Sequence, residues 1–84
     1  MFTVYILQCE TTGRHYCGQT SELSGRVRQH NDPEYRGSLT TKRFPGPWRV
    51  VFELSSSTRS EVLKLEGKIK KRGIERYLAK LAAI

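Results

Sequence analysis

The residue with the clearest chemical potential is Glu66, a carboxylate that helical spacing places on the apolar side of its helix. At about 100° per residue, Leu65 and Ile69 fall on one arc with Val62. Glu66 lies inside that arc. Burial of a lone carboxylate costs several kcal/mol unless a cation or hydrogen-bond donors meet it. An ion pair with Lys70, four residues later, is the simplest explanation when this helix is taken alone.

Two further polar residues, Arg26 and His30, lean toward the core from another segment that is predicted to be helical. They are four residues apart and share the inward side of that helix with Leu23 and Val27. Each polar group taken singly is more often a structural contact than part of a site. Three inward-leaning charged or titratable groups in so short a chain, Glu66 included, favour a functional site.

The chain is strongly basic. Its 84 residues include fifteen Lys and Arg and eight Asp and Glu, which gives a formal net charge of +7. Such a charge favours partners that carry phosphate, with nucleic acid first among them. A charge run that only keeps a surface solvated is the competing explanation. We expect backbone-phosphate contacts from Arg36, Lys42, Arg43, Arg49 and Lys70, with Lys68, Lys71 and Arg72 extending the same surface.

Aromatic residues in and beside the basic connection are candidates for stacking on exposed bases. Tyr35, Phe44 and Trp48 have the required side chains. Trp48 stands at the start of a predicted strand, so we assign it to the core instead.

Strand and turn signals predict a β-hairpin at the N-terminus. Thr3–Cys9 and His15–Gly18 are rich in β-branched and aromatic residues, and Glu10–Gly13 between them supplies turn chemistry. A short helix is predicted from Leu23 to about His30, with Ser21 as its N-cap.

The second half of the chain begins with a long, basic connection over Asn31–Pro47. A third strand is predicted at Trp48–Leu54. A helix then starts at Thr58, where Thr58 and Glu61 have the spacing of a capping box, and it stops at Gly73. A shorter amphipathic helix continues to the C-terminus. The pattern predicts an α+β fold, a small single domain over residues 1–84 with a three-stranded antiparallel sheet flanked by helices, in the order β-β-α-β-α-α.

Composition also argues against several classes of protein. Cys9 and Cys17 are offset on neighbouring strands, so we expect no disulfide, and with only His15 and His30 as imidazoles we expect no structural zinc. A reducing, intracellular (cytoplasmic) compartment fits this cysteine usage. The longest apolar run is a few residues and no basic leader precedes it, so we expect neither a membrane span nor a signal peptide. We expect a monomer.

The order of the polar residues along the chain carries a resemblance. Thr3-Val4-Tyr5 is followed, eleven residues after Tyr5, by Tyr16-Cys17-Gly18, and then by Arg26, His30 and the helical Glu66. This ordered set resembles the GIY-YIG nuclease family over nearly the whole chain. Either tripeptide alone would be weak, whereas the full set is specific. The likeness is greatest to small, single-domain bacterial members, which share a basic segment like Thr40–Arg43 and a serine-rich approach to the glutamate helix like Ser55–Glu61.

The resemblance implies a role for each of five residues. Glu66 would hold one Mg²⁺ or Mn²⁺, and a single protein carboxylate is adequate because Mg²⁺ keeps several waters. Arg26 would bind the scissile phosphate. Tyr5 would be the general base, helped toward phenolate by nearby cations, and Tyr16 would assist it by hydrogen bonding. His30 would relay a proton or contact phosphate, and is as readily structural. Without the resemblance, ordinary strand packing is the better interpretation of both tyrosines.

The sequence departs from the family pattern in three places. Thr3 stands where the family usually has Gly, and Cys17 where it usually has Ile or Val, although neither position carries the chemistry. A polar residue beyond the glutamate helix, often Asn, has no counterpart here, since only Glu75 and Arg76 lie nearby. No appended domain for choosing a DNA sequence or lesion is expected.

Three functions remain open on the sequence. The first is a divalent-metal-dependent endonuclease that hydrolyses DNA phosphodiester bonds, with single-stranded or branched DNA as the candidate preferred substrate. The second is a nucleic-acid-binding module that keeps the fold without turnover. The third is a basic interaction protein in which Glu66 is simply paired with Lys70. The first is favoured because Tyr5, Tyr16, Arg26 and Glu66 are all present.

Overall fold

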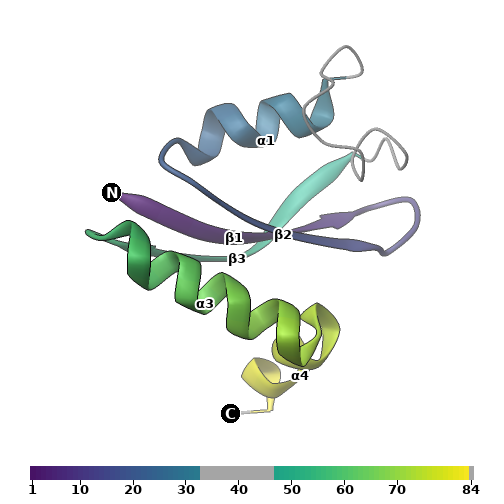
Figure 1. Cartoon of the computed structure of the whole chain (residues 1–84). Coiled ribbons are helices and arrows are strands. Elements are labelled where there is room, and N and C mark those ends of the chain that lie inside the picture. The colour runs from purple at the N-terminus through teal and green to yellow at the C-terminus, as the bar shows by residue number, and fades with distance from the viewer. Residues whose placement is uncertain (33–46, 84) are drawn as a thin grey trace.

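The computed structural model describes residues 1–32 and 47–83, which form one three-stranded sheet with helices on both faces (Figure 1). The strands are antiparallel and lie in the order β2-β1-β3. This arrangement confirms the predicted α+β fold and its order of elements. In chain order the elements are β1 (Phe2–Cys9), β2 (His15–Thr20), α1 (Leu23–Asn31), β3 (Trp48–Ser56), α3 (Arg59–Arg72) and α4 (Ile74–Ala82).

The central strand β1 is buried on both faces. Because successive side chains of a strand point to opposite faces, Val4 and Ile6 pack toward α3 and α4, in one core cluster with Ile69. Tyr5 and Leu7 point the other way, into a second cluster that Leu23 and Val27 of α1 cover. Figure 1 shows these two helical layers, with α1 on one face and α3 and α4 on the other. The sheet therefore separates two sets of inward-facing side chains.

The strands run further than their side chains predict. Gln19 and Thr20 extend β2 by pairing with Val4 and Thr3 of β1. Backbone ladders do not depend on side-chain type, which explains why the alternation of side chains predicted too short a strand. The hairpin turn reaches a positive φ at Gly13, which is 75°.

Two predicted helix caps are wrong in detail. α1 begins at Leu23 as predicted, but its N-cap is Glu22, whose carboxylate accepts a hydrogen bond from the Gly25 amide at 3.1 Å. Ser21 does not cap it. α3 has Thr58 at its N-cap position without a side-chain cap hydrogen bond.

The predicted capping box does not form because its glutamate has another partner. The Glu61 carboxylate accepts a hydrogen bond from the Ser56 hydroxyl at 2.6 Å. The Thr58 amide donates to the same Ser56 hydroxyl oxygen at 3.3 Å. The residues of the box were identified correctly, but a nearby serine competed for both of its polar groups.

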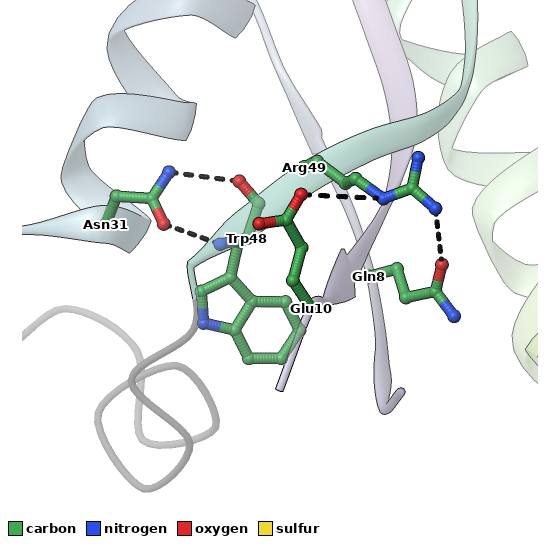
Figure 2. Close-up of polar contacts among 5 residues, drawn as sticks. All are labelled: Gln8, Glu10, Asn31, Trp48 and Arg49. Atoms are coloured by element: carbon green, nitrogen blue, oxygen red, sulfur yellow. Dashed lines mark hydrogen bonds and ion pairs between the residues drawn. The ribbon is translucent and has the colours of Figure 1, made fainter. Parts of the chain in front are cut away.

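Asn31, the last residue of α1, fixes this helix to the start of β3. Its side-chain amide donates to the Trp48 carbonyl at 3.0 Å, and its side-chain oxygen accepts from the Trp48 amide at 2.7 Å (Figure 2). The Trp48 side chain is buried beside Tyr5, Leu7 and Cys9, which confirms its assignment to the core. The two hydrogen bonds hold α1 in register with the sheet, and α1 carries two of the candidate site residues.

The two cysteines are free and face opposite sides of the sheet. Cys9 belongs to the cluster under α1, and Cys17 to the cluster under α3. A disulfide between them is excluded by this placement, as predicted. None of the helices in the described ranges is long and apolar enough to cross a membrane.

Candidate active site

Tyr5, Tyr16 and His30 form a buried polar cluster between the hairpin and α1. The Tyr5 hydroxyl oxygen lies 3.1 Å from His30 Nε2, in a hydrogen bond whose direction depends on the tautomer of His30. The Tyr16 ring stacks at a tilt on His30, with centroids 4.8 Å apart, and lies 6.3 Å from the Tyr5 ring. Tyr5 is fully buried and His30 is only 3% exposed. Three residues that are far apart in the sequence therefore meet at one point.

The register of the hairpin creates this meeting. Tyr5 lies opposite Gly18 and Leu7 opposite Tyr16, so the two tyrosines are diagonal neighbours on the face that α1 covers. Gly18 leaves the space into which the Tyr5 phenol extends. A Cβ at residue 18 would lie 2.8 Å from the Tyr5 hydroxyl oxygen and 3.1 Å from Cε1 of Tyr16. The glycine of the second tripeptide is thus required by close approach of side chains.

We expect Gly18→Ala to destabilise the protein and to displace the Tyr5 phenol. Overpacking of a filled core costs about 1–3 kcal/mol, and both contacts of the new methyl group are rigid rings. Urea unfolding measures the loss. Gly67→Ala is the matched control, because nothing lies within 4 Å of a Cβ there and α3 should gain stability. Equal stability of Gly18→Ala and wild type would contradict this packing.

Arg26 lies one helical turn before His30 and is half-buried. Its Nη1 donates to the Gln29 side-chain oxygen at 3.2 Å. Burial raises the pKa of Tyr5 to about 12, while a hydrogen bond from the Arg26 side chain opposes that rise by favouring the phenolate. The guanidinium is therefore in contact with the phenol that the resemblance assigns as general base. Without a further cation this phenol is protonated at neutral pH.

His30 is neutral at neutral pH. Burial, with a smaller contribution from the Arg26 charge, lowers the pKa of His30 to about 4. A neutral imidazole can accept the Tyr5 proton at Nε2 when Nδ1 carries the hydrogen. The cluster therefore has the parts of a proton relay.

The depressed pKa of His30 predicts a pH-dependent stability. Between pH 6.5 and about 4 the unfolded chain binds a proton at His30 and the folded protein does not, so stability falls as pH falls through this window. At about 1.4 kcal/mol per pH unit between the two pKa values, the full loss is roughly 3 kcal/mol. Urea unfolding from pH 7 to pH 4 measures it. His30→Gln should flatten the slope and His15→Gln should retain most of it. An unchanged slope in His30→Gln would refute the assignment.

Glu66 lies on the other face of the sheet. Its side chain is 17% exposed, and its Oε2 forms an ion pair with Lys70 Nζ at 2.9 Å. Burial, followed by the Glu66 charge, raises the pKa of Cys17 to about 11, which places the carboxylate beside the thiol on the α3 side of β2. The inward position predicted from the helical spacing is confirmed, and so is the ion pair that offered its simplest explanation.

The two halves of the predicted site meet at β2, the edge strand. Tyr16 belongs to the tyrosine cluster on one face, and the charge of Lys70 reaches it from the other, since Tyr16 is among the groups that raise the pKa of Lys70 after Glu66 itself. Cys17, the residue after Tyr16 in β2, points to the face that α3 covers. The sequence suggested that polar groups from two helices could converge. The structure places Arg26 and His30 with α1 on one face of the sheet, and Glu66 with α3 on the other.

Glu66 is the carboxylate best placed to hold a metal ion. Within residues 1–32 and 47–83, no group of three or more His, Cys, Asp or Glu side chains gathers as a metal site. A second oxygen lies on this side of the sheet: Gln19 Oε1 is buried without a hydrogen-bond partner in the described part of the chain, and Gln19 faces the same side of β2 as Cys17. One carboxylate and one amide oxygen suit Mg²⁺, which retains several waters, provided that Lys70 moves away.

Only some of the residues predicted to contact nucleic acid lie in the described part of the chain. Arg36, Lys42 and Arg43 lie outside the described residues, as do Tyr35 and Phe44. Lys70 is 56% exposed and held by Glu66.

Arg49 is already engaged on the surface of β3. Its Nη2 donates to the Gln8 side-chain oxygen at 3.2 Å, and its Nε lies 3.9 Å from a Glu10 carboxylate oxygen (Figure 2). A phosphate at Arg49 would have to compete with that carboxylate.

Comparison with known proteins identifies the family. A sequence model described as the GIY-YIG catalytic domain matches residues 1–77. The chain belongs to the GIY-YIG family. It is 33% identical to a UPF0213 protein of Nitratidesulfovibrio vulgaris over 96% of its own length and 70% of that protein. Membership confirms the resemblance on which the five residue roles rest, including the likeness to small bacterial members.

A second group of GIY-YIG relatives is larger. The chain is 37% identical to a structure-specific endonuclease subunit SLX1 homolog of Giardia intestinalis, over 79% of the chain and 19% of that protein. The chain spans about a fifth of the length of these curated relatives. Among solved structures, the solution structure of a UPF0213 protein from Bacillus halodurans matches with a TM-score of 0.58 and 24% identity, covering 99% of this chain and 85% of that one. That likeness supports the fold.

The sequence did not predict the roles of Gln19 and Glu22. Gln19 was not singled out, although its place two residues after Cys17 on one strand puts it on the same face. Glu22 was missed as the cap of α1 because Ser21 beside it is the commoner capping residue. The separation of Glu66 from the tyrosines by the sheet depends on which face each helix covers, and helical spacing does not encode that.

Proposed function

We propose that this chain is a divalent-metal-dependent endonuclease that hydrolyses phosphodiester bonds of DNA. The observation that carries the proposal is the buried hydrogen bond between Tyr5 and His30, 3.1 Å long, with the Arg26 guanidinium against the same phenol. A fold does not need such a polar cluster in its core, and burying it costs stability unless every group is satisfied. Membership of a catalytic-domain family supports the same conclusion.

Each side chain of the cluster has a task in the proposed reaction. Arg26 binds the scissile phosphate and stabilises the charge that grows on its oxygens. Burial and then the Arg26 charge lower the pKa of His30, and a phosphate bound at Arg26 would offset that charge. His30 Nε2 can then take the Tyr5 proton as the Tyr5 oxygen takes the proton of the attacking water. Tyr16 holds the His30 ring by stacking at 4.8 Å.

Glu66 holds the metal ion in this proposal, with Gln19 as a second oxygen donor. When bound, Mg²⁺ or Mn²⁺ would supply charge neutralisation for phosphate and an acidic bound water. Lys70 is the resident cation that the metal must replace at Glu66. Once released, its exposed ammonium group would be free to contact a DNA phosphate.

Single-stranded or branched DNA is the proposed substrate preference. The SLX1 relatives are structure-specific endonuclease subunits, and this chain resembles about a fifth of their length. The two free cysteines are consistent with work inside the cell. A monomer would suffice, because every proposed site residue comes from one chain.

The alternative is a nucleic-acid-binding module without turnover. Its support is the Glu66–Lys70 ion pair, which satisfies the carboxylate without a metal, together with a Tyr5 pKa of about 12. Under this alternative the chain binds DNA with a steep salt dependence and cuts nothing.

Cleavage assays on labelled single-stranded, duplex and flap DNA test the proposal. We expect cutting with Mg²⁺ or Mn²⁺ and none with a chelator, and flap or single-stranded DNA should be cut faster than duplex. Binding without cutting on every substrate would establish the alternative. Cutting that persists in chelator would contradict the metal dependence.

A further inference from the structure

A hollow of about 520 Å³ lies where the β1–β2 hairpin meets the junction of α3 and α4. Arg14 and His15 line it from the hairpin, and Arg72, Glu75 and Arg76 from the two helices. Figure 1 shows α3 running beneath the sheet and α4 turning back below its C-terminal end. Residues from both ends of the sequence thus surround one space.

A second hollow, of about 550 Å³, lies between α3 and α4. Its floor includes Leu65 and Tyr77, and its sides carry Lys68, Lys71, Arg72 and Lys80. Arg72 lines both hollows, so both lie beside this one residue. We use the name basic corner for the surface made by Arg14, Lys68, Lys71, Arg72, Arg76 and Lys80.

The charges of the basic corner are poorly balanced. Six Lys and Arg side chains line the two hollows, and Glu75 is their one carboxylate. The Glu75 carboxylate lies 3.7 Å from His15 Nδ1, a buried atom without a hydrogen bond in the described part of the chain. Like charges that line one surface repel one another, and a bound anion relieves that repulsion.

Helix electrostatics explains only some of these residues. Lys71 and Arg72 lie in the last turn of α3, where cations interact favourably with the helix dipole. Arg76 is in the first turn of α4, the positive end of that helix, where a cation is unfavourable. A solvated helix surface would not converge on the hollow from the hairpin and two helices. A bound anion accounts for all of them.

The basic corner adjoins the candidate active site. Arg72 is six residues after Glu66 on α3, which is about 9 Å along the helix axis. His15 precedes Tyr16 on β2 and lies at the other side of the hollow.

We propose that the basic corner binds the backbone phosphates of a DNA strand beside the cleaved bond. Its ligand is the substrate of the proposed function, and on that function the proposal rests. The strand passes Glu66 and Tyr16 at the edge of β2 and continues into the first hollow, where Arg14, Arg72 and Arg76 contact successive phosphates. The groove beyond Arg72 receives the strand further on, through its three lysines.

Binding of short, fluorescein-labelled DNA in the presence of chelator tests the proposal without cleavage. Fluorescence anisotropy over a series of salt concentrations gives the Kd and its salt slope. Arg72→Gln should raise the Kd severalfold and reduce the slope by about one. Lys64→Gln is the matched control, an exposed lysine of the same helix that lines neither hollow. Its effect should be less than half as large.

Glu75→Gln should change the Kd for DNA in the opposite direction. Removal of the one carboxylate of the corner should lower the Kd at least twofold, a gain that loss of folding cannot produce. Equal effects of Arg72→Gln and Lys64→Gln, or a Kd unchanged in Glu75→Gln, would overturn the proposal. A chain that binds in this pattern yet never cuts DNA would refute the nuclease and leave the basic corner standing. Cleavage of DNA by the wild type, together with normal DNA binding by Arg72→Gln, would refute the basic corner and leave the nuclease standing.

Discussion

Tyr5→Phe is expected to lower the rate of DNA cleavage by at least about 100-fold, the smaller end of what a positioned proton-transfer group contributes. The substitution removes the hydroxyl that contacts His30 Nε2 and Arg26, and it retains the ring that packs with Leu7 and Trp48. The protein should stay folded, because the cost is that of one buried hydrogen bond, about 1–3 kcal/mol. Initial rates on flap DNA and urea unfolding separate the two effects.

Tyr77→Phe is the matched control for Tyr5→Phe. Tyr77 packs edge-on against Phe52 on the opposite face of the sheet, with ring centroids 5.6 Å apart. Because Tyr77 also lines the second hollow, the rates are compared at saturating DNA, where loss of its hydroxyl should leave the cleavage rate within about threefold of wild type, since it touches no reacting group. If Tyr5→Phe cuts as fast as Tyr77→Phe, the hydroxyl of Tyr5 takes no part in the reaction.

Glu66→Gln and Lys70→Gln should separate a metal ligand from a structural ion pair. Each variant removes one charge of the same 2.9 Å ion pair. Glu66→Gln leaves the exposed Lys70 ammonium group and should lose less than about 1 kcal/mol of stability, whereas Lys70→Gln leaves the 17% exposed carboxylate unpaired and should lose more. Their metal affinities should move in opposite directions. Glu66→Gln should weaken Mn²⁺ binding at least about tenfold, and Lys70→Gln should strengthen it by removing the competing cation.

Titration of Mn²⁺ followed by electron paramagnetic resonance measures these affinities directly, independently of turnover. Gln19→Ala should weaken binding less than Glu66→Gln, because Gln19 supplies a neutral oxygen. Identical affinities in wild type, Glu66→Gln and Lys70→Gln would show that no metal binds at this carboxylate.

The sequence predicted the elements well because their signals are local. Alternation of apolar residues marks the strands, and the arc of Val62, Leu65 and Ile69 marks α3 and isolates Glu66 as a charge on its inward side. Gly73 ends α3 as predicted, with a positive φ of 99° that favours glycine. The ion pair with Lys70 was also readable, since it depends on a spacing of four residues within one helix.

The arrangement of the site across the sheet could not be predicted from the sequence in the same way. Tyr5 and Tyr16 are brought together by the hairpin register, which their spacing implied. Glu66 reaches the edge of β2 from the opposite face because α3 packs there, and α1 packs under the tyrosines. That choice of faces is a property of the tertiary structure. Gln19 depends on the same packing. The sequence predicted Lys68, Lys71 and Arg72 as part of a basic surface, but their meeting with Arg14 and Arg76 at the basic corner depends on the packing too.

Cleavage of one flap DNA by wild type, Glu66→Gln and Lys70→Gln, measured side by side in Mg²⁺, tests the central claim most directly. The proposed site predicts that Glu66→Gln loses at least about 1000-fold in rate, since metal and carboxylate act together in stabilising the transition state. Lys70→Gln, which breaks the same ion pair, should stay within about tenfold of wild type, a loss of the size expected for one phosphate contact. Equal rates for Glu66→Gln and Lys70→Gln would contradict a metal site at Glu66 and leave only the ion pair.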